Sequence, residues 1–432
     1  MNYQETISYL FTSAPLFQQV GKAAYKEGLS NTLTLDEHFD HPHQKYNTIH
    51  IAGTNGKGST AHTIAAILQH HGYRVGLYTS PHLIDFRERI RVNGETIEES
   101  FVVRFVEQNR SFFEPLHPSF FELTTALAFL YFATKNVDVA VIEVGLGGRL
   151  DCTNIISPEL SIITNISFDH TQFLGNTLSD IAKEKAGIIK ANTPVVIGER
   201  CKETRIVFQE KAKEMHAPIS FAEDELEIIE TSITPEHLRH YSTSHWGNFE
   251  SQLTGECQIK NTATILTAAR LLKERFEITE EDVHHAFRNV CTETGLMGRW
   301  QTLFTNPTTV CDTGHNMGGW VYLSKQLHDI SEHFNDLHII FGMASDKDVE
   351  SIAKVLPSKA HYYWTKASVH RAMSEHKIES IGKEFGLEGE SYPTVSDAYV
   401  AAKQNVSAKG FIYIGGSSFV VADLLSYLQH NK

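Results

Sequence analysis

Short apolar runs alternate with helix-like patterns through the first half of the chain. The apolar runs predict strands at Thr48–Ile51, Val75–Tyr78, Val137–Glu143, Leu160–Asn165 and Pro194–Ile197. Apolar residues at helical spacing predict intervening helices, notably over Ala61–Leu68, Glu122–Thr134 and Ser179–Ile189. Strands that are apolar throughout and separated by helices are typical of a parallel sheet covered on both faces. We therefore predict an α/β fold whose ligands bind at the carboxyl ends of the strands.

A second alternation begins near Arg299 and predicts a separate, smaller α/β domain. Its expected strands are Thr308–Cys311, Leu337–Phe341, His361–Thr365 and Phe411–Gly415. The glycine-containing link at 294–298 is a plausible hinge, and a length of 432 residues agrees with two or three domains. We therefore expect residues 1–296 to form one domain and residues 297–432 to form the other.

Two stretches of the chain lack a clear period, and we expect both to be irregular. Residues up to Tyr46 are polar, with a loop-like patch at Gly28–Leu33. The stretch from Arg200 to Gln258 includes an acidic run that we interpret as a solvated face, formed by Asp224, Glu225, Glu227 and Glu230. The segment that follows, Asn261–Phe276, has apolar side chains at helical spacing and predicts a helix.

Composition narrows the classes of partner. The 52 acidic residues outnumber the 38 basic ones, and no basic stripe is interleaved with aromatic residues, so we expect no nucleic-acid partner. Five scattered cysteines argue against a disulfide framework and against a zinc site. No apolar run is long enough to span a bilayer, and the start, Met1–Glu5, lacks the basic segment of a signal peptide. We therefore expect a cytoplasmic protein with no membrane partner.

The stretch with the clearest chemistry lies between a predicted strand and a predicted helix. Its sequence is Gly53-Thr54-Asn55-Gly56-Lys57-Gly58-Ser59-Thr60. Glycines let backbone N–H groups approach phosphate oxygens, and the helix N-terminus adds partial positive charge. Lys57 can reach the terminal phosphates, while Ser59 or Thr60 can hold Mg²⁺. The spacing departs from the standard phosphate-loop motif because Gly58 separates Lys57 from Ser59. An ordinary glycine-rich turn is the alternative interpretation.

Three further side chains could serve chemistry near such a loop. Glu143 ends a predicted strand beside a glycine-rich turn, where a carboxylate can hold Mg²⁺ near a phosphate. His170 follows another predicted strand at the same sheet edge, and a hydrogen-bonded structural histidine is its alternative interpretation. Lys185 lies on a predicted helix. It is either a surface lysine or a buried, partly neutral amine that can react with CO₂ to form a carbamate.

Five motifs together resemble the folylpolyglutamate synthase/dihydrofolate synthase family of Mur-type ligases. They are Gly53–Ser59, Thr79–Leu83, Glu143–Asp151, Asp169–Thr171 and Glu184–Gly187. Their order and spacing resemble the family, and the form of the Glu143 loop resembles its bifunctional bacterial members. The resemblance implies a P-loop Mur-ligase-like central domain with a mostly parallel sheet, and a smaller C-terminal Rossmann-like α/β domain.

The resemblance also implies a role for each matching position. Residues 53–60 would bind the triphosphate of ATP, and Lys57, Lys185 and His170 would be catalytic, with Lys185 carbamylated. Mg²⁺ would be held by Ser59, Ser80, Glu143 and His170. The positions that match the family's pterin site are Ser119, Phe120, Phe121, Glu122, Leu150, Asp151 and Cys152. An aromatic ring can pack on a flat pterin and a carboxylate can accept from its N–H groups, although either phenylalanine could instead belong to the core.

Matches to the family continue toward the C-terminus. The implied ATP contacts there are Asn261, Arg299 and Asp312, and the implied contacts to glutamate or folate are His315 and Ser417. Two residues depart from the family pattern. Cys152 replaces a small alanine or serine, which could change the shape of the pterin pocket. Met317 replaces a proline, which could change the position of its loop.

The resemblance predicts an ATP-dependent ligase that joins L-glutamate to dihydropteroate, to a reduced folate, or to both, through an acyl phosphate. We expect a monomer whose partners are these small molecules. One alternative is a folylpolyglutamate synthase alone. Another is a peptidoglycan-type Mur ligase, for which the stretch of about 50 residues before the phosphate loop is short for an appended domain. The third is a nucleotide-dependent switch, which would show no glutamate-dependent phosphate release.

Overall fold

A computed structural model describes residues 1–13, 28–334 and 336–431. The chain divides into two compact units, and each is described by itself. The N-terminal unit comprises Met1–Gln252 with Lys260–Leu296, and the C-terminal unit comprises Leu253–Ile259 with Met297–Lys432. The short segment Leu253–Ile259 therefore joins the C-terminal unit, which a single boundary after residue 296 did not anticipate.

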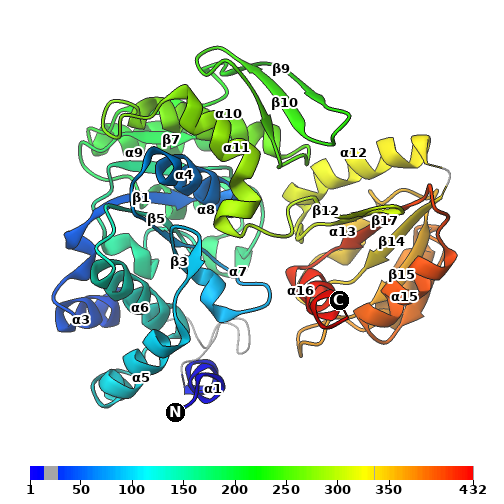
Figure 1. The fold of residues 1–432 in the computed structure, drawn as a ribbon, viewed down its shortest axis with the longest axis horizontal. Helices are drawn as coiled ribbons and strands as arrows, with labels where there is room; N and C mark the ends of the chain where they lie inside the picture. Colours follow the sequence, from blue (N-terminus) through cyan, green and yellow to red (C-terminus); the bar gives the residue numbers. More distant parts are fainter. Residues whose placement is uncertain (14–27, 335, 432) are drawn as a thin grey trace. The chain divides into compact units, whose positions relative to one another are not determined.

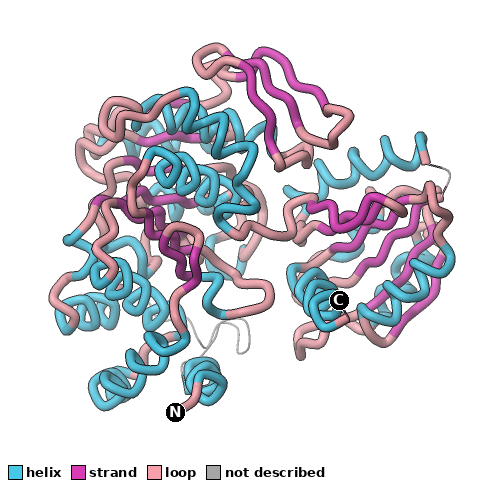
Figure 2. Tube along the Cα trace, in the orientation of Figure 1, coloured by secondary structure: helices cyan, strands magenta, loops and turns pink. Residues whose placement is uncertain are grey.

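The N-terminal unit is built on an eight-stranded sheet (Figures 1 and 2). In spatial order its strands are β4 (Glu95–Thr96), β3 (Ile90–Val92), β2 (Val75–Tyr78), β5 (Val139–Glu143), β1 (Asn47–Ala52), β6 (Leu160–Ile163), β7 (Val195–Ile197) and β8 (Ile219–Phe221). The run from β2 to β8 is parallel throughout, and β3 and β4 pair antiparallel at one edge. The predicted α/β fold with a mostly parallel sheet is therefore confirmed.

Helices cover both faces of this sheet, because alternate residues of a strand face opposite sides, as β5 shows. On β5, Val139 and Val141 join one apolar cluster, whereas Ala140 and Ile142 join another. The first cluster is completed chiefly by α4, α10 and α11, and the second by α5 and α6. The helices of the unit are α1 (Tyr3–Ser13), α3 (Ser30–His38), α4 (Lys57–His71), α5 (Glu99–Phe113), α6 (Phe120–Thr134), α7 (Thr171–Leu174), α8 (Leu178–Ala186), α9 (Lys202–Glu214), α10 (Gln258–Leu272) and α11 (Glu280–Thr294), with 3-10 turns η2 (Pro42–Lys45), η3 (Phe86–Arg89), η4 (Glu114–Leu116) and η5 (Cys152–Ile155).

Two predictions of irregular structure were wrong. The first 46 residues contain α1, α3 and η2, and the predicted loop at Gly28–Leu33 runs into α3. The sequence of α3 has almost no apolar stripe from which a helix could be predicted. Its Leu35 is nevertheless fully buried, so tertiary contacts stabilise the helix. The stretch from Arg200 to Gln258 contains α9, β8 and a three-stranded antiparallel sheet of β9 (Ile228–Ile233), β10 (Arg239–Thr243) and β11 (Asn248–Ser251).

The acidic run in that stretch is not uniformly a solvated face. Glu227 is buried, and its carboxylate accepts a hydrogen bond from Arg270 Nε at 3.0 Å. His245 Nδ1 lies 3.0 Å from the other carboxylate oxygen. A buried charge needs such partners, and their distance in sequence hid them from a pattern-based reading.

The C-terminal unit has a six-stranded sheet. In spatial order its strands are β12 (Gln301–Thr305), β13 (Thr308–Cys311), β17 (Phe411–Gly415), β14 (Leu337–Phe341), β15 (His361–Thr365) and β16 (Gly389–Tyr392). Only β12 pairs antiparallel. The helices are α12 (Met317–His333), α13 (Val349–Ala353), α14 (Glu375–Glu384), α15 (Val395–Asn405) and α16 (Ser418–His430). The four strands expected here all occur with the predicted bounds, which confirms the smaller α/β domain. Across the described ranges, none of the helices combines the length and apolar character needed to cross a bilayer.

Candidate active site

The loop from Gly53 to Ser59 links β1 to α4 as the sequence predicts, with Lys57 as the first residue of the helix. Gly53 and Gly56 have φ angles of +145° and +83°, which glycine adopts without the strain that a side chain would bring. The loop is tied to the strand-end turn after β6: Thr54 N–H donates to Asn165 O at 2.9 Å, and Asn55 N–H donates to Asn165 Oδ1 at 2.8 Å. Hydrogen bonds to Asn165, after β6, thus hold the loop that leaves β1.

Gly53→Ala should disrupt this loop more than a comparable change elsewhere. A Cβ at position 53 would overlap the Thr164 hydroxyl, in addition to the strain of a positive φ. We expect a loss of about 1–3 kcal/mol in the free energy of unfolding and loss of nucleotide binding. Gly72→Ala is the matched control, because its φ is +107° but no atom lies within 4 Å of the added Cβ. Thermal denaturation and nucleotide titration of both variants test this. Equal nucleotide binding by the two would contradict it.

Lys57 and Glu143 lie together at the carboxyl end of the sheet. The parallel register pairs Ile51 of β1 with Glu143 of β5, so Glu143 lies level with the end of β1, just before the loop begins. Lys57 Nζ is 4.0 Å from Glu143 Oε1 and donates to Thr54 O at 3.1 Å. Glu143 is 3% exposed, and its Oε2 accepts the backbone N–H of Ser80 at 3.0 Å. The structure therefore brings together three of the positions predicted to serve phosphate and metal.

The turn that carries His170 also reaches the phosphate loop. Thr54 Oγ1 donates to Ser167 O and accepts from Ser167 N, both at 3.1 Å. His170 has a φ of +49° and caps the short helix α7, and Asp169 Oδ1 accepts its backbone N–H at 2.9 Å. The turn thus lies beside the loop, while a metal-binding role for the imidazole of His170 stays a prediction.

Lys185 is buried, so the alternative interpretation of a surface lysine is wrong. It is 4% exposed, and its Nζ donates to Gly53 O at 2.9 Å. Burial, assisted by the positive charge of Lys57, lowers the pKa of Lys185 to about 7. A large fraction of the amine is therefore neutral near pH 7. This is the form that can react with CO₂, so the physical condition for a carbamate is met.

The lowered pKa of Lys185 makes stability depend on pH in a defined direction. The unfolded chain holds its lysine proton up to the ordinary pKa near 10.5, whereas the folded chain releases it near 7. Between these values the unfolded state binds more protons, so rising pH favours the folded state. In CO₂-free buffer, the Tm of the protein relative to Lys185→Met should therefore increase from about pH 7 toward pH 10. A difference that is constant or shrinks over that window would show that Lys185 keeps its proton in the fold.

The residues at this centre suit a magnesium ion better than a softer metal. The predicted ligands offer two hydroxyls, one carboxylate and one imidazole, and Mg²⁺ prefers oxygen. Among the residues that the structure describes, no group of three His, Cys, Asp or Glu side chains has the geometry of a metal site. A cation here would therefore draw on Ser59, Ser80 and the oxygens of a bound nucleotide as well as Glu143.

The predicted pterin-binding residues of α6 have clear structural tasks. Ser119 is the N-cap of the helix: its hydroxyl accepts from Glu122 N–H, and the Glu122 carboxylate accepts from Ser119 N–H at 2.6 Å. Phe120 is fully buried and stacks on Phe11 with 5.1 Å between ring centroids. Phe121 is partly exposed, and its ring packs over Gly145 of the loop after Glu143. Of the two phenylalanines, Phe121 is therefore the one able to meet a ligand.

Asp151 and Cys152 organise the loop that follows Glu143. Asp151 Oδ2 accepts from Leu146 N–H at 2.9 Å, and Oδ1 accepts from Thr153 N–H at 2.9 Å. Cys152 Sγ lies 3.0 Å from Thr125 Oγ1, so this departure from the family pattern places a hydrogen-bonding thiol against α6. Leu150 lies in the turn before them and is partly exposed. Contacts of these residues to a substrate stay predictions.

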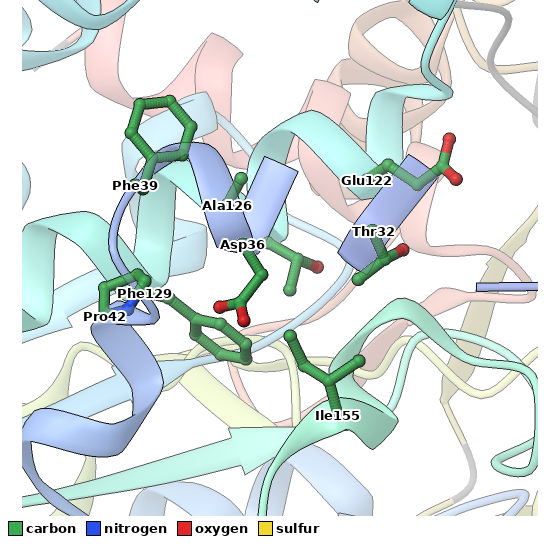
Figure 3. A pocket seen from close by; sticks show the side chains of 9 residues that line it. Thr32, Asp36, Phe39, Pro42, Glu122, Ala126, Phe129 and Ile155 are labelled. Atoms are coloured by element: carbon green, nitrogen blue, oxygen red, sulfur yellow. The ribbon is translucent and has the colours of Figure 1, made fainter. Parts of the chain in front are cut away.

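A small pocket lies between α3, α6, η2 and η5, and Figure 3 shows Asp36, Thr32 and Glu122 on its walls. Its lining residues are Thr32, Asp36, Phe39, Pro42, Glu122, Thr125, Ala126, Phe129 and Ile155. The Thr32 hydroxyl is buried and has no hydrogen-bond partner within the described ranges. Glu122, a predicted site residue, lines this pocket together with Thr125, whose hydroxyl contacts Cys152. Thr32 and Asp36 also line it, and the sequence analysis did not predict either. Thr32 and Asp36 stand four residues apart on one helical face, and that spacing was the available signal.

The C-terminal unit gathers a second set of predicted residues on its own. Asp312 Oδ2 accepts Trp300 N–H and Oδ1 accepts Gly314 N–H, both at 2.7 Å, while burial raises the pKa of this carboxyl. Arg299 bonds the Thr313 hydroxyl. His315 Nδ1 lies 3.1 Å from Thr313 O, so the ring donates from that nitrogen. These contacts shape one loop after β13, whereas nucleotide or glutamate contacts by its residues stay predictions.

Three other predicted positions have local tasks. Ser417 is buried and its hydroxyl accepts from Phe419 N–H at 3.0 Å as the N-cap of α16. Met317 is the first residue of α12, a position that also favours proline, so either residue suits the start of this helix. In the N-terminal unit, Asn261 lies against the phosphate loop, because a Cβ added at Gly56 would overlap its side-chain amide oxygen.

Comparison with known families agrees with this architecture. Residues 51–269 match the Mur ligase middle domain, and residues 298–418 match the Mur ligase glutamate ligase domain. The two matches, together with the phosphate loop and the two α/β units, define the class as a Mur-type ligase.

Two relatives indicate the family of Mur-type ligases to which the chain belongs. The chain is 32% identical to the dihydrofolate synthase/folylpolyglutamate synthase of Bacillus subtilis, over 94% of this chain and 96% of that protein. It is 31% identical to a probable bifunctional folylpolyglutamate synthase/dihydropteroate synthase of Haloferax volcanii, over 98% of this chain, but it spans only 50% of the length of that relative. The chain belongs to the folylpolyglutamate synthase/dihydrofolate synthase family.

Solved structures show the same fold. Escherichia coli FolC in complex with DHPP and ADP is 26% identical and superposes with a TM-score of 0.83, over 100% of this chain and 98% of that one. A bifunctional folylpolyglutamate synthase/dihydrofolate synthase from Yersinia pestis, complexed with AMPPNP and a Mn ion, is 25% identical with a TM-score of 0.81, over 99% of this chain and 98% of that one. The predicted fold and family are thus confirmed.

Proposed function

We propose that the protein is an ATP-dependent ligase that joins L-glutamate to dihydropteroate, to the γ-carboxyl of folate glutamates, or to both. The observation that carries the proposal is the convergence of Lys57, Glu143 and Ser80 on one phosphate loop, with the buried Lys185 beneath it. Family membership supports the substrate class, because the relative from Bacillus subtilis bears the names of both synthase activities.

The proposed reaction has two steps. The substrate carboxylate attacks the γ-phosphate of ATP, which gives an acyl phosphate and ADP. The α-amino group of glutamate then attacks the acyl carbon, and inorganic phosphate leaves. Lys57 stabilises negative charge on the transferred group, and the N–H groups at the start of α4 orient the phosphates. A divalent cation held by Ser59, Ser80, Glu143 and His170 would add positive charge at the phosphate oxygens.

We also propose that Lys185 acts as a carbamate. Burial lowers the pKa of its amine to about 7, so a substantial fraction is neutral near pH 7, and reaction of that neutral form with CO₂ would place an anionic carbamate beside the phosphate loop. An anion there suits a centre that holds both Lys57 and a divalent cation. Cytoplasmic location and the monomeric state remain predictions from the sequence.

The assay that tests the proposed function is phosphate release with ATP and L-glutamate. We expect release to require glutamate and an acid substrate, with dihydropteroate and a reduced folate monoglutamate compared in parallel. Glutamate-dependent release with the reduced folate but not with dihydropteroate would favour a folylpolyglutamate synthase without dihydrofolate synthase activity. Release that needs neither glutamate nor acid would contradict a ligase and favour a nucleotide-dependent switch.

A further inference from the structure

A buried chain of three side chains links the strand before the phosphate loop to the loop after Glu143. His50 lies in β1 and is 0% exposed. Its Nε2 is 2.8 Å from Thr153 Oγ1, and Thr153 Oγ1 donates to Asp151 Oδ1 at 2.5 Å. Neither His50 nor Thr153 belongs to the predicted site, so the contact gives the loop an anchor that sequence patterns did not indicate.

The single hydroxyl proton of Thr153 fixes the direction of both hydrogen bonds. An ionised Asp151 can only accept hydrogen bonds, so the Thr153 hydroxyl must donate its proton to that carboxylate. His50 must then donate from Nε2, which makes Nδ1 the unprotonated nitrogen. In the reverse arrangement, a protonated Asp151 would donate to Thr153 and Thr153 would donate to His50 Nε2. The proton of His50 would then lie on Nδ1. The tautomer of His50 therefore reports the ionisation of Asp151.

The surroundings favour the first arrangement. Asp151 also accepts backbone N–H groups from Leu146 and Thr153, which a carboxylate does best when ionised. His50 Nδ1 is buried and has no partner among the described residues, so a proton there would be a buried donor without an acceptor. An unpaired acceptor at that position is the lesser cost, because buried N–H groups without partners are the rarer kind.

We propose that His50 is a positioning residue: through the Thr153 hydroxyl it keeps Asp151 in its accepting form and so holds the loop that follows Glu143. That loop carries Gly145 and Leu146, and the Phe121 ring packs on Gly145. The link therefore runs from the phosphate-loop strand to the aromatic side chain predicted to meet the acid substrate. Its effect on catalysis rests on the proposed function, whereas its proton arrangement does not.

Charged and titratable groups on neighbouring elements act on His50 and Asp151. Burial, assisted by the positive charge of Lys190 after α8, lowers the pKa of His50 to about 3, so the ring stays neutral. Lys185 on α8 and Cys152 on η5 face Asp151. Burial raises the pKa of Asp151, and its hydrogen bonds, that of the Thr153 hydroxyl first among them, oppose the rise. Removing that hydroxyl should therefore let Asp151 take up a proton at higher pH.

Nitrogen-15 NMR of the full-length protein with labelled histidine tests the proton arrangement directly. The signal absent from His50→Gln identifies His50. We expect a neutral ring protonated at Nε2 across the range of pH in which the enzyme is active. A ring protonated at Nδ1, or a charged ring, would overturn the proposal. This readout does not require ligase activity, so it stands even if phosphate release shows the proposed function to be wrong.

Paired variants test the effect on catalysis. Thr153→Val removes the hydroxyl at nearly constant shape and Thr153→Ser keeps it. His50→Leu removes the donor, and His50→Gln places an amide N–H near the position of Nε2. We expect Thr153→Val and His50→Leu to lose at least about tenfold in kcat/KM, and the Ser and Gln variants to stay within about threefold.

The pH profile separates positioning from a general structural defect. In Thr153→Val the acid limb of kcat/KM should move to higher pH, since Asp151 has lost a donor. Thr153→Ser should keep the limb of the unmodified protein. A uniform loss with an unmoved limb, or full activity in Thr153→Val, would overturn the proposal. If His50→Leu fails to fold, the nearly isosteric valine variant still decides between these outcomes.

Discussion

Replacing Lys57 with alanine should reduce glutamate-dependent phosphate release by about 10²–10³-fold or more, while the protein still folds. Lys57 opens α4, and its ammonium lies 4.0 Å from the buried Glu143 carboxylate at the mouth of the phosphate loop. The Lys57 ammonium donates a hydrogen bond to Thr54 O, so its loss should cost only about 0.5–1.5 kcal/mol of stability. The effect should therefore fall on kcat rather than on Tm.

Two comparisons make the Lys57 result interpretable. Lys383→Ala removes a lysine that is 64% exposed on α14 and should leave phosphate release unchanged. Circular dichroism and thermal denaturation of Lys57→Ala should match the unmodified protein within a few degrees. Near-normal ligation by Lys57→Ala would remove the phosphate assignment, because Lys57 is the predicted residue of α4 that supplies a cation to the loop.

Lys185→Ala should lower activity by about 10–100-fold, and a small carboxylate such as acetate should restore part of it. The physical reason is that Lys185 is buried beneath Gly53, so its removal leaves a space in which an anion can take the place of a carbamate. Rescue should saturate with acetate concentration, and chloride at equal ionic strength should not reproduce it.

The matched control for Lys185 lies on the same helix. Lys183 is 67% exposed and pairs loosely with Asp180 at 3.9 Å, so Lys183→Ala should keep full activity and show no response to acetate. Mass spectrometry under CO₂-rich conditions should show a modification of the unmodified protein that Lys185→Ala lacks. Full activity in Lys185→Ala, or no response to any small carboxylate, would remove the carbamate from the mechanism.

The sequence predicted the parts of this site that follow from strand ends. Parallel strands place their carboxyl ends at one edge, so Lys57 and Glu143 could be brought together from the apolar runs of β1 and β5 alone. The resemblance then added Ser80, whose contact with Glu143 depends on a turn that periodicity does not specify. Apolar pattern and motif together therefore sufficed for the fold and for the phosphate centre.

The parts that were missed depend on polar contacts between distant residues. The link from His50 through Thr153 to Asp151 leaves no period in the sequence, because each residue looks like an ordinary member of its own strand or turn. The pocket beside α3 was missed because that helix carries too few apolar residues to be recognised. The pairing of the buried Glu227 with Arg270 also joins residues far apart in the sequence, so no periodic pattern indicates it.

The burial of Cys152 has a practical consequence for labelling the protein. Burial, followed by the neighbouring charge of Asp151, raises the pKa of this thiol, and burial does the same for Cys311. Maleimide reagents act on thiolates and should therefore modify the partly exposed Cys201, Cys257 and Cys291 first. Cys257 belongs to the segment grouped with the C-terminal unit, and Cys201 belongs to the N-terminal unit. Fluorophores could thus be attached to each unit through native side chains, leaving the thiol beside α6 untouched.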